Sequence, residues 1–269
     1  MNLISKVLQK KRQNSRCALV PFVTAGYPSI ELTIDILFTL DKKGADIIEL
    51  GIPYSDALAD GQLIQNASKL ALNNGVYIDQ VLGLLSKIAY KIHAPIIIFT
   101  YYNPILVRGL SRFIQEISHF GVKGLIIPDL PIEETDYVIH LCNYYQLELI
   151  LFISPTSSQN RINNILSKAP GCLYLVSSTG VTGIRDSIHS DIRFVSYDIS
   201  SRTDKLVMFG FGISSPSQVS GILKLKLNID AIVVGSAFTQ ILSNYSNYNS
   251  VDIIEEVGSF CSKMKLAMI

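Results

Sequence analysis

The chain has 269 residues, 48% of them hydrophobic and 17% charged, and its formal net charge at pH 7 is +1. This composition provides for a large apolar core, and the balanced charge lacks the basic surface that binding to nucleic acid or an anionic membrane requires. No apolar run reaches the roughly 18–20 residues of a membrane span. Four cysteines and four histidines are scattered without metal-ligand spacing, which predicts buried, reduced thiols in an intracellular protein and no metal site.

The N-terminal residues 1–16 are basic and mildly amphipathic, and they lack the apolar segment and cleavage site of a secretory signal. Their charge would also suit a transit peptide. Because the first predicted strand follows directly, we expect instead a first helix that covers the bottom of the fold.

From residue 18 onward, short apolar runs that predict strands alternate with segments that predict helices. The predicted strands are residues 18–23, 47–50, 96–100, 125–127, 149–153, 173–176, 206–209 and 231–234. The predicted helices are residues 29–43, 63–73, 79–91, 133–145 and 251–265, and a further helix opens at residue 235.

Eight strand–helix units favour an α/β fold, a (β/α)8 barrel of the TIM type with an extra N-terminal helix. Several strands are rich in Ile and Val on both faces, as in a fully covered parallel sheet. We expect a single domain over residues 1–269. The alternative is an open, doubly wound sheet of six strands, which would usually carry a GxGxxG turn after its first strand; the sequence has none there.

The segment 47–61 carries Glu49 in an apolar run and Asp56 and Asp60 in the polar loop that follows, and we take Glu49 and Asp60 as the candidate pair. Strand alternation places Glu49 and Gly51 on one face, which predicts a glutamate pointing inward beside a glycine that leaves room for a ligand. Burial raises the pKa of Glu49, whereas Asp60 has more water around it and stays ionised. Such a pair suits acid–base catalysis. The competing interpretation is a structural glutamate paired with an arginine or lysine, and an aspartate that caps a helix.

Further candidates follow from the barrel, because active sites of such barrels lie at the carboxyl ends of the strands. Tyr174 lies on the interior face near the end of the sixth predicted strand, and Tyr101 and Asp129 follow the third and fourth. Small-residue turns follow the last three strands, at residues 177–183, 210–214 and 235–237. Because glycine lets backbone N–H groups approach an anion, we expect these turns to converge on a phosphate.

Two features of the loops narrow the chemistry. No lysine stands at the carboxyl end of a predicted strand, which disfavours a Schiff-base aldolase and favours acid–base catalysis. The polar stretch 177–190 contains two glycines, which predicts a mobile lid or, alternatively, an ordinary surface loop.

Taken in chain order, these motifs resemble the tryptophan synthase α chain family. The resemblance rests on residues 21–28 (PFVTAGYP), 49–56 (ELGIPYSD), 58–61 (LADG), 179–183 (TGVTG), 210–215 (GFGISS) and 235–237 (GSA). It covers nearly the whole chain, and the segment around Glu49 and Asp60 is highly specific. It implies a retro-aldol cleavage of indole-3-glycerol phosphate to indole and glyceraldehyde 3-phosphate in tryptophan biosynthesis.

The resemblance also implies roles for single residues. Glu49 would protonate the indole ring carbon and assist deprotonation of the glycerol hydroxyl, Asp60 would stabilise charge at the indole N–H, and Tyr174 would support the site. The residues implied to bind the substrate are Phe22 and Tyr101 at the indole, Thr182 beside Asp60, and Gly183, Gly212, Gly235 and Ser236 at the phosphate.

The implied partner is a pyridoxal phosphate β chain that receives indole through a tunnel in an α2β2 heterotetramer, and the α chain itself would need no cofactor. Loops 53–58 and 129–134 would dock the partner. Ala57 and Gln62 stand where proline is common in the family, and Ser178 where many members have arginine. These departures bear on the stiffness of the docking loop and on closure of the lid.

Two other functions stay open at this point. A phosphosugar isomerase could use Glu49 as its base, although such chemistry usually wants a histidine or lysine that no predicted strand end offers. A non-catalytic phosphate-binding barrel could regulate a partner. The expected compartment is the cytoplasm, or the plastid stroma if the chain is encoded in the organelle. The Ile- and Asn-rich composition is typical of an AT-rich genome such as an organellar one.

Overall fold

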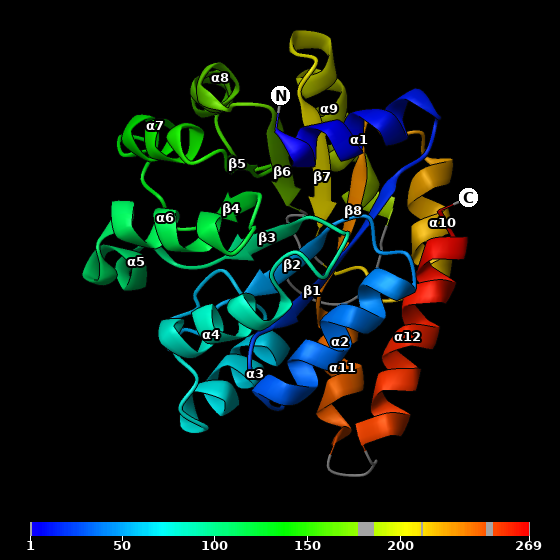
Figure 1. Cartoon of the computed structure of the whole chain (residues 1–269). Helices are drawn as coiled ribbons and strands as arrows, with labels where there is room; N and C mark the ends of the chain where they lie inside the picture. The colour runs from blue at the N-terminus through cyan, green and yellow to red at the C-terminus, as the bar shows by residue number, and fades with distance from the viewer. Residues whose placement is uncertain (1, 177–185, 211, 246–249, 269) are drawn as a thin grey trace.

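The computed structural model describes residues 2–176, 186–210, 212–245 and 250–268. Eight parallel strands in these ranges close into a barrel in chain order, and the last pairs back onto the first (Figure 1). They are β1 (Ala18–Thr24), β2 (Ile48–Gly51), β3 (Ile96–Phe99), β4 (Gly124–Ile126), β5 (Glu148–Ile153), β6 (Cys172–Val176), β7 (Leu206–Gly210) and β8 (Ala231–Val234). The predicted (β/α)8 barrel is confirmed, and the open six-stranded sheet is ruled out.

Helices surround the barrel on its outer side (Figure 1). In the described ranges they are α1 (Leu3–Gln13), α2 (Ile30–Lys42), α3 (Gln62–Asn73), α4 (Ile78–Ile88), α5 (Tyr102–Arg108), α6 (Leu110–His119), α7 (Thr135–Tyr144), α8 (Gln159–Lys168), α9 (Asp186–Arg202), α10 (Pro216–Lys224), α11 (Ser236–Ser243) and α12 (Ser250–Leu266). The helices predicted from the sequence are present, with ends that differ by a few residues.

Several helices were not predicted, and α5 shows why. A proline shortly after a strand usually indicates a loop, but Pro104 lies in the first turn of α5. Proline is tolerated there because the first N–H groups of a helix have no carbonyl partner within it. Likewise α8 and α9 are rich in polar residues, so their helical period was not recognised in the sequence.

Strand alternation divides the apolar core into two layers. Ile47 and Ile97 lie in the barrel interior, whereas their neighbours Ile48 and Ile98 pack between the sheet and the helices. Because the side chains of a strand alternate between its two faces, every strand is buried on both. The predicted assignment of faces on the second strand is therefore confirmed.

Helix α1 closes the amino-terminal end of the barrel. Its Ile4 and Leu8 are fully buried in the interior cluster, and the Ser5 hydroxyl donates a hydrogen bond to the buried carboxylate of Glu148 at 2.6 Å. The helix crosses the end of the barrel where β7 begins (Figure 1). This confirms the expected helix at the bottom of the fold.

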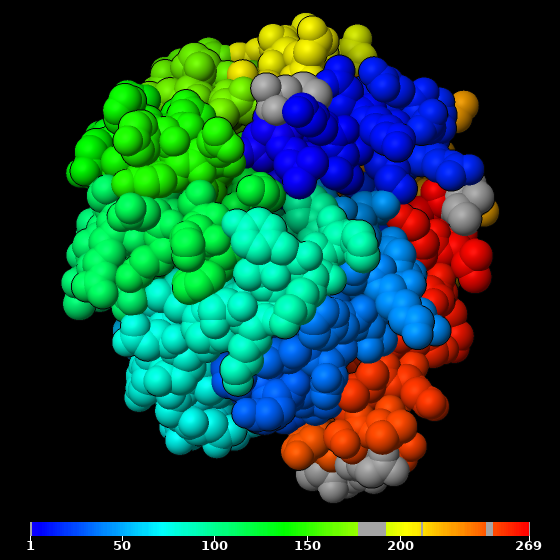
Figure 2. Space-filling view, in the orientation of Figure 1, coloured from blue at the N-terminus to red at the C-terminus, as the bar shows by residue number. Residues whose placement is uncertain are grey.

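Two aspartates attach the outer helices to the strand starts. Asp230 accepts hydrogen bonds from Nε and Nη2 of Arg12 on α1, both at 2.6 Å. Asp46 pairs with Nζ of Lys11 on α1 at 2.6 Å and with Lys265 on α12. In the space-filling view α12, coloured red, lies against the blue α2 (Figure 2). The two ends of the chain are thus anchored to the same end of the barrel.

All four cysteines are free and buried, as predicted. Burial raises the pKa of the Cys142 and Cys261 thiols to about 12, which keeps them protonated at neutral pH. Within the described ranges, no helix combines the length and the apolar character needed to cross a membrane.

Replacing Asp230 with alanine should lower the free energy of unfolding by roughly 3 kcal/mol, because it removes the partner of a charged guanidinium and of the Val207 N–H. Chemical denaturation measures the change. Asp136→Ala is the matched control, since the Asp136 carboxylate pairs with Lys168 while 71% exposed and should contribute less than about 1 kcal/mol. Equal losses in the two variants would contradict this assignment.

Candidate active site

Glu49 lies near the carboxyl end of β2, between Phe22 of β1 and Ile97 of β3. Its side chain is 1% exposed, and Oε2 has no hydrogen-bond partner among the described residues. Burial, and then the nearby charge of Asp60, raise the pKa of Glu49 to about 8. The predicted burial and raised pKa are confirmed.

The structural alternative for Glu49 required a basic partner. None of the ion pairs formed within the described ranges includes Glu49. An acid that is buried without a cation is stable only when it is protonated at neutral pH. Glu49 therefore offers a proton at the mouth of the barrel.

Asp60 lies at the end of a tight turn between β2 and α3. Its backbone N–H donates to the carbonyl of Ala57 at 3.1 Å, and its Oδ2 accepts a hydrogen bond from the Tyr101 hydroxyl at 3.0 Å. Burial raises the pKa of Asp60 to about 6, and the Tyr101 hydrogen bond opposes this rise. The expectation that Asp60 is well hydrated is wrong, but the expectation that it stays ionised at neutral pH agrees with its pKa, which lies below that of Glu49. The helix-cap alternative is also wrong, because Gly61 is the cap of α3.

The space beside Gly51 is already filled by a side chain. A Cβ added at Gly51 would lie 2.6 Å from Cζ of Phe22, and one added at Gly235 would lie 3.2 Å from Cδ1 of the same ring. The prediction that Gly51 leaves room for a ligand is therefore wrong. Its lack of a side chain lets the Phe22 ring lie against the backbone of β2.

Aromatic rings line the interior around Glu49. Phe22 contacts Phe99 with ring centroids 5.7 Å apart, Tyr101 contacts Phe99 at 6.1 Å, and Tyr174 contacts Phe152 at 4.8 Å. Phe99 and Phe152 were not predicted as site residues. Strand alternation predicts both, because each lies two residues along its strand from another side chain that points into the barrel.

Tyr174 lies on the inner face of β6, as predicted, and is 3% exposed. Burial, and then the charges of Glu49 and Asp60, raise the pKa of its phenol well above the ordinary value, so it stays neutral. A Cβ added at Gly210 on β7 would lie 2.2 Å from the Tyr174 hydroxyl oxygen. Only glycine at position 210 leaves this tyrosine in place.

The turns after β7 and β8 lie next to each other because these strands pair. The third predicted turn, 177–183, lies outside the described residues, so convergence of all three on a phosphate stays a prediction. The helices that follow differ in one respect. The start of α10 is closed by Gln218, whose Oε1 accepts from the N–H groups of Ser214 and Ser215. The start of α11 at Gly235 has no side-chain cap, which leaves N–H groups for an anion.

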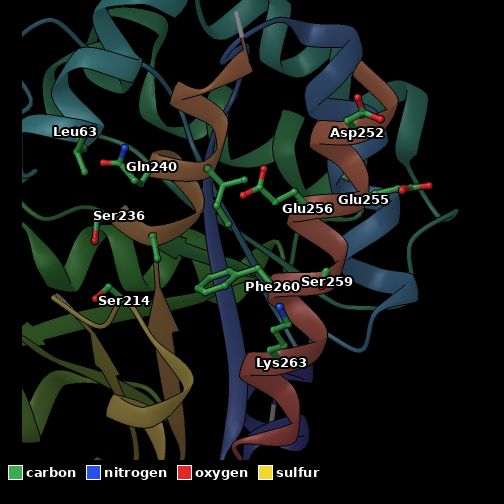
Figure 3. A pocket seen from close by; sticks show the side chains of 12 residues that line it. Leu63, Ser214, Ser236, Gln240, Asp252, Glu255, Glu256, Ser259, Phe260 and Lys263 are labelled. Carbon is green, nitrogen blue, oxygen red and sulfur yellow. The ribbon is translucent and has the colours of Figure 1, made fainter. Parts of the chain in front are cut away.

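A groove of about 740 Å³ opens beside this rim, between α11 and α12. Ser236 and Gln240 line one side, and Asp252, Glu255 and Glu256 of α12 line the other (Figure 3). The carboxylates would repel an anion, so a phosphate is favoured at the start of α11 and disfavoured deeper in the groove.

Some predicted features lie elsewhere. Thr182, Gly183 and Ser178 lie outside the described residues, as does most of the predicted lid. Its last residues, 186–190, belong to α9, so a loop was wrongly predicted there. Asp129 accepts a hydrogen bond from the Tyr102 N–H at 2.8 Å and thereby fixes the start of α5. The described residues contain no group of three or more His, Cys, Asp or Glu side chains that could hold a metal ion.

A closed parallel barrel with two carboxyl groups of unequal pKa at the carboxyl ends of its strands defines a (β/α)8-barrel enzyme equipped for acid–base chemistry.

Comparison with known proteins narrows this class. The family model described as tryptophan synthase alpha chain matches residues 8–268. The tryptophan synthase alpha chain of Gracilaria tenuistipitata var. liui is 57% identical over 268 residues, covering 100% of this chain and 97% of that one. The chain of the same name from Antithamnion sp. is 55% identical over the full length of both. The crystal structure of tryptophan synthase subunit alpha from Legionella pneumophila str. Paris has a TM-score of 0.88 and 33% identity, covering 100% of this chain and 98% of that one.

The chain therefore belongs to the tryptophan synthase alpha chain family, and the resemblance stated from its motifs is confirmed. It is a carbon–carbon lyase that cleaves indole-3-glycerol phosphate to indole and glyceraldehyde 3-phosphate in tryptophan biosynthesis.

The raised pKa of Glu49 predicts a pH-dependent stability. The folded protein holds a proton on this group between about pH 4.5 and about pH 8 that the unfolded chain has released, so the free energy of unfolding falls as pH rises through this interval. Glu49→Gln removes this titrating group, so the free energy of unfolding of the variant should fall less steeply with pH, by the contribution of one proton. Denaturation of both proteins at a series of pH values measures it, and parallel curves would reject a neutral buried Glu49.

Proposed function

We propose that Glu49 and Asp60 are the acid–base pair of this lyase. Glu49, protonated at neutral pH, gives its proton to the indole ring carbon. Its carboxylate then takes the proton of the glycerol hydroxyl as the carbon–carbon bond breaks, so the acid is restored. Asp60, ionised at neutral pH, accepts a hydrogen bond from the indole N–H and stabilises the positive charge that develops on the nitrogen. The observation that carries this proposal is the inward-facing Oε2 of Glu49, which has no partner in the described part of the chain.

We further propose that the indole lies among the aromatic rings and the phosphate at the start of α11. Phe22, Tyr101 and Tyr174 provide buried aromatic surface at the mouth. Gly235 and Ser236 supply uncapped N–H groups, with Gly212 in the adjacent turn. The contribution of Thr182 and Gly183 stays a prediction.

The geometry does not favour the two other functions. An isomerase would need an electrophilic histidine or lysine near Glu49, and no strand is followed by one at its carboxyl end in the described part of the chain. A non-catalytic barrel would have no use for a buried acid that has no ion-pair partner in the described ranges, because such a group is unfavourable for folding. Each observation supports catalysis by Glu49.

Glu49→Gln and Asp60→Asn should each lower the turnover of indole-3-glycerol phosphate by on the order of 10²-fold or more, because each removes a group that transfers a proton or stabilises charge. Release of indole from the purified chain measures the effect. Asp56→Asn is the matched control on the same loop, where the carboxylate is exposed and bonded to Ser55. Undiminished indole release by either site variant would reject its proposed role.

We propose that the partner is a tryptophan synthase β chain and that it docks on the loops at the mouth. Leu58 is 90% exposed and Val107 of α5 is 82% exposed, although both are apolar. The Tyr101 hydroxyl accepts from Ala59 N–H at 3.0 Å, and Asp129 bonds the start of α5, so loops 53–58 and 129–134 are joined through this helix. Exposed apolar side chains on linked loops are typical of a protein interface.

Leu58→Asp should raise the dissociation constant for a purified tryptophan synthase β chain by about tenfold or more, because it places a charge in an apolar contact. Isothermal titration calorimetry measures the binding. Tyr144→Asp is the control: Tyr144 is 75% exposed and ends α7, which leads into the start of β5 at the end of the barrel away from the mouth. Equal weakening by both variants would argue against docking at the mouth.

The remaining expectations are proposals of the same kind. The proposed steps use only side chains of this chain, and pyridoxal phosphate would belong to the partner in an α2β2 assembly. The single domain over residues 1–269 stays a prediction. A location in the cytoplasm or the plastid stroma also stays a prediction, and the relatives from Gracilaria and Synechocystis support these two compartments.

A further inference from the structure

The turn that carries Asp60 is held from two sides by side chains. On one side the Tyr101 hydroxyl accepts from the Ala59 N–H and donates to Oδ2 of Asp60, both at 3.0 Å. On the other side Nε2 of Gln65 donates to the carbonyl oxygens of Ala57 and Asp60, again both at 3.0 Å. Gln65 therefore binds the first and last residues of the turn.

The position of Gln65 makes this contact rigid. It lies in α3, and its backbone N–H donates to the Gly61 carbonyl at 3.0 Å in the first turn of that helix. Ile64, the preceding residue, lies 3.5 Å from the Cβ position of Gly235 at the proposed phosphate rim. The Gln65 amide is half-buried, and its helix α3 also contacts the proposed phosphate rim through Ile64. Gln65 therefore fixes the turn relative to both ends of the proposed substrate.

Without Gln65 the turn would lose the side chain that joins the Ala57 and Asp60 carbonyls, and the Tyr101 hydroxyl would hold only its Ala59–Asp60 side. Ala57 does not fix its own backbone torsion, as a proline would, and Leu58 at the tip is 90% exposed. The backbone bond from Asp60 N–H to the Ala57 carbonyl would remain. A typical hydrogen bond contributes about 1 kcal/mol net, so loss of both amide bonds would free the turn without unfolding the barrel.

We propose that Gln65 is a positioning residue for the lyase reaction, which orients the Asp60 carboxylate toward the indole N–H by joining the two ends of the 57–60 turn. This inference rests on the proposed role of Asp60. It concerns an amide that does not touch the reacting atoms and acts through the backbone of the turn.

The test compares Gln65→Leu, which keeps the size and removes both donors, with Gln62→Leu. Gln62 lies one turn earlier on the same helix, and its amide bonds only Asn66 within the described ranges. We expect Gln65→Leu to lower kcat for indole release about tenfold and to change KM less than threefold, with the acidic limb of the pH profile moving below about 6 as water reaches Asp60. Gln62→Leu should leave kcat, KM and the acidic limb of the pH profile unchanged.

A second arm separates positioning from plain stability. In an Asp60→Asn background, Gln65→Leu should lower kcat less than twofold, because it acts through a group that is already absent. A full tenfold loss in that background, or a lowered melting temperature with kcat unchanged in the single variant, would overturn the inference. If Gln65→Leu does not fold, Gln65→Met serves as the second variant, since methionine is a strong helix former of similar length. Unchanged indole release in Asp60→Asn itself would reject the proposed role of Asp60 and this inference with it, whereas a loss in Asp60→Asn with none in Gln65→Leu would overturn this inference alone.

Discussion

The structure depends on the carboxyl group of Glu49, which is held in an apolar barrel with no counter-ion among the described residues. Desolvation of Glu49, and then the negative charge of Asp60, raise its pKa to about 8. A lysine or arginine at the mouth would reverse this effect by stabilising the carboxylate. The described strand ends leave Glu49 without one. The apolar aromatic lining therefore has an electrostatic consequence as well as a packing one, because it keeps the acid protonated at neutral pH.

The two sides of the mouth have complementary electrostatics. The side formed by β2 and β3 carries the two acids, and the side formed by β7 and β8 carries uncapped backbone N–H groups. Phe22 of β1 lies between them, with its ring against both Gly51 and Gly235. An elongated substrate with an aromatic end and an anionic end matches this polarity in only one orientation. Backbone donors suit the anionic side, since a lysine there would also lower the pKa of Glu49.

Alternation and turn residues in the sequence were enough to predict the barrel, the inward direction of Glu49 and the neighbouring turns after β7 and β8. They were not enough for Asp60, whose surroundings are set by Tyr101, two residues after β3, and by Gln65 from α3. They also failed at Gly51, because alternation gives the direction of a side chain but not which neighbour fills the space. In each case the missing information is a contact between residues distant in sequence. A single sequence with no structure contains no direct record of such contacts.

The pairing of β8 with β1 has a consequence for biosynthesis. As the chain leaves the ribosome, the first strand exposes an unpaired edge until the last one emerges more than two hundred residues later. Such an edge can recruit other extended segments, and nascent α/β chains with this topology are vulnerable to aggregation. Arg12, which bonds Asp230 immediately before β8, lies on the helix that precedes this exposed edge. The seam that completes the barrel can thus form only after most of the chain has been synthesised.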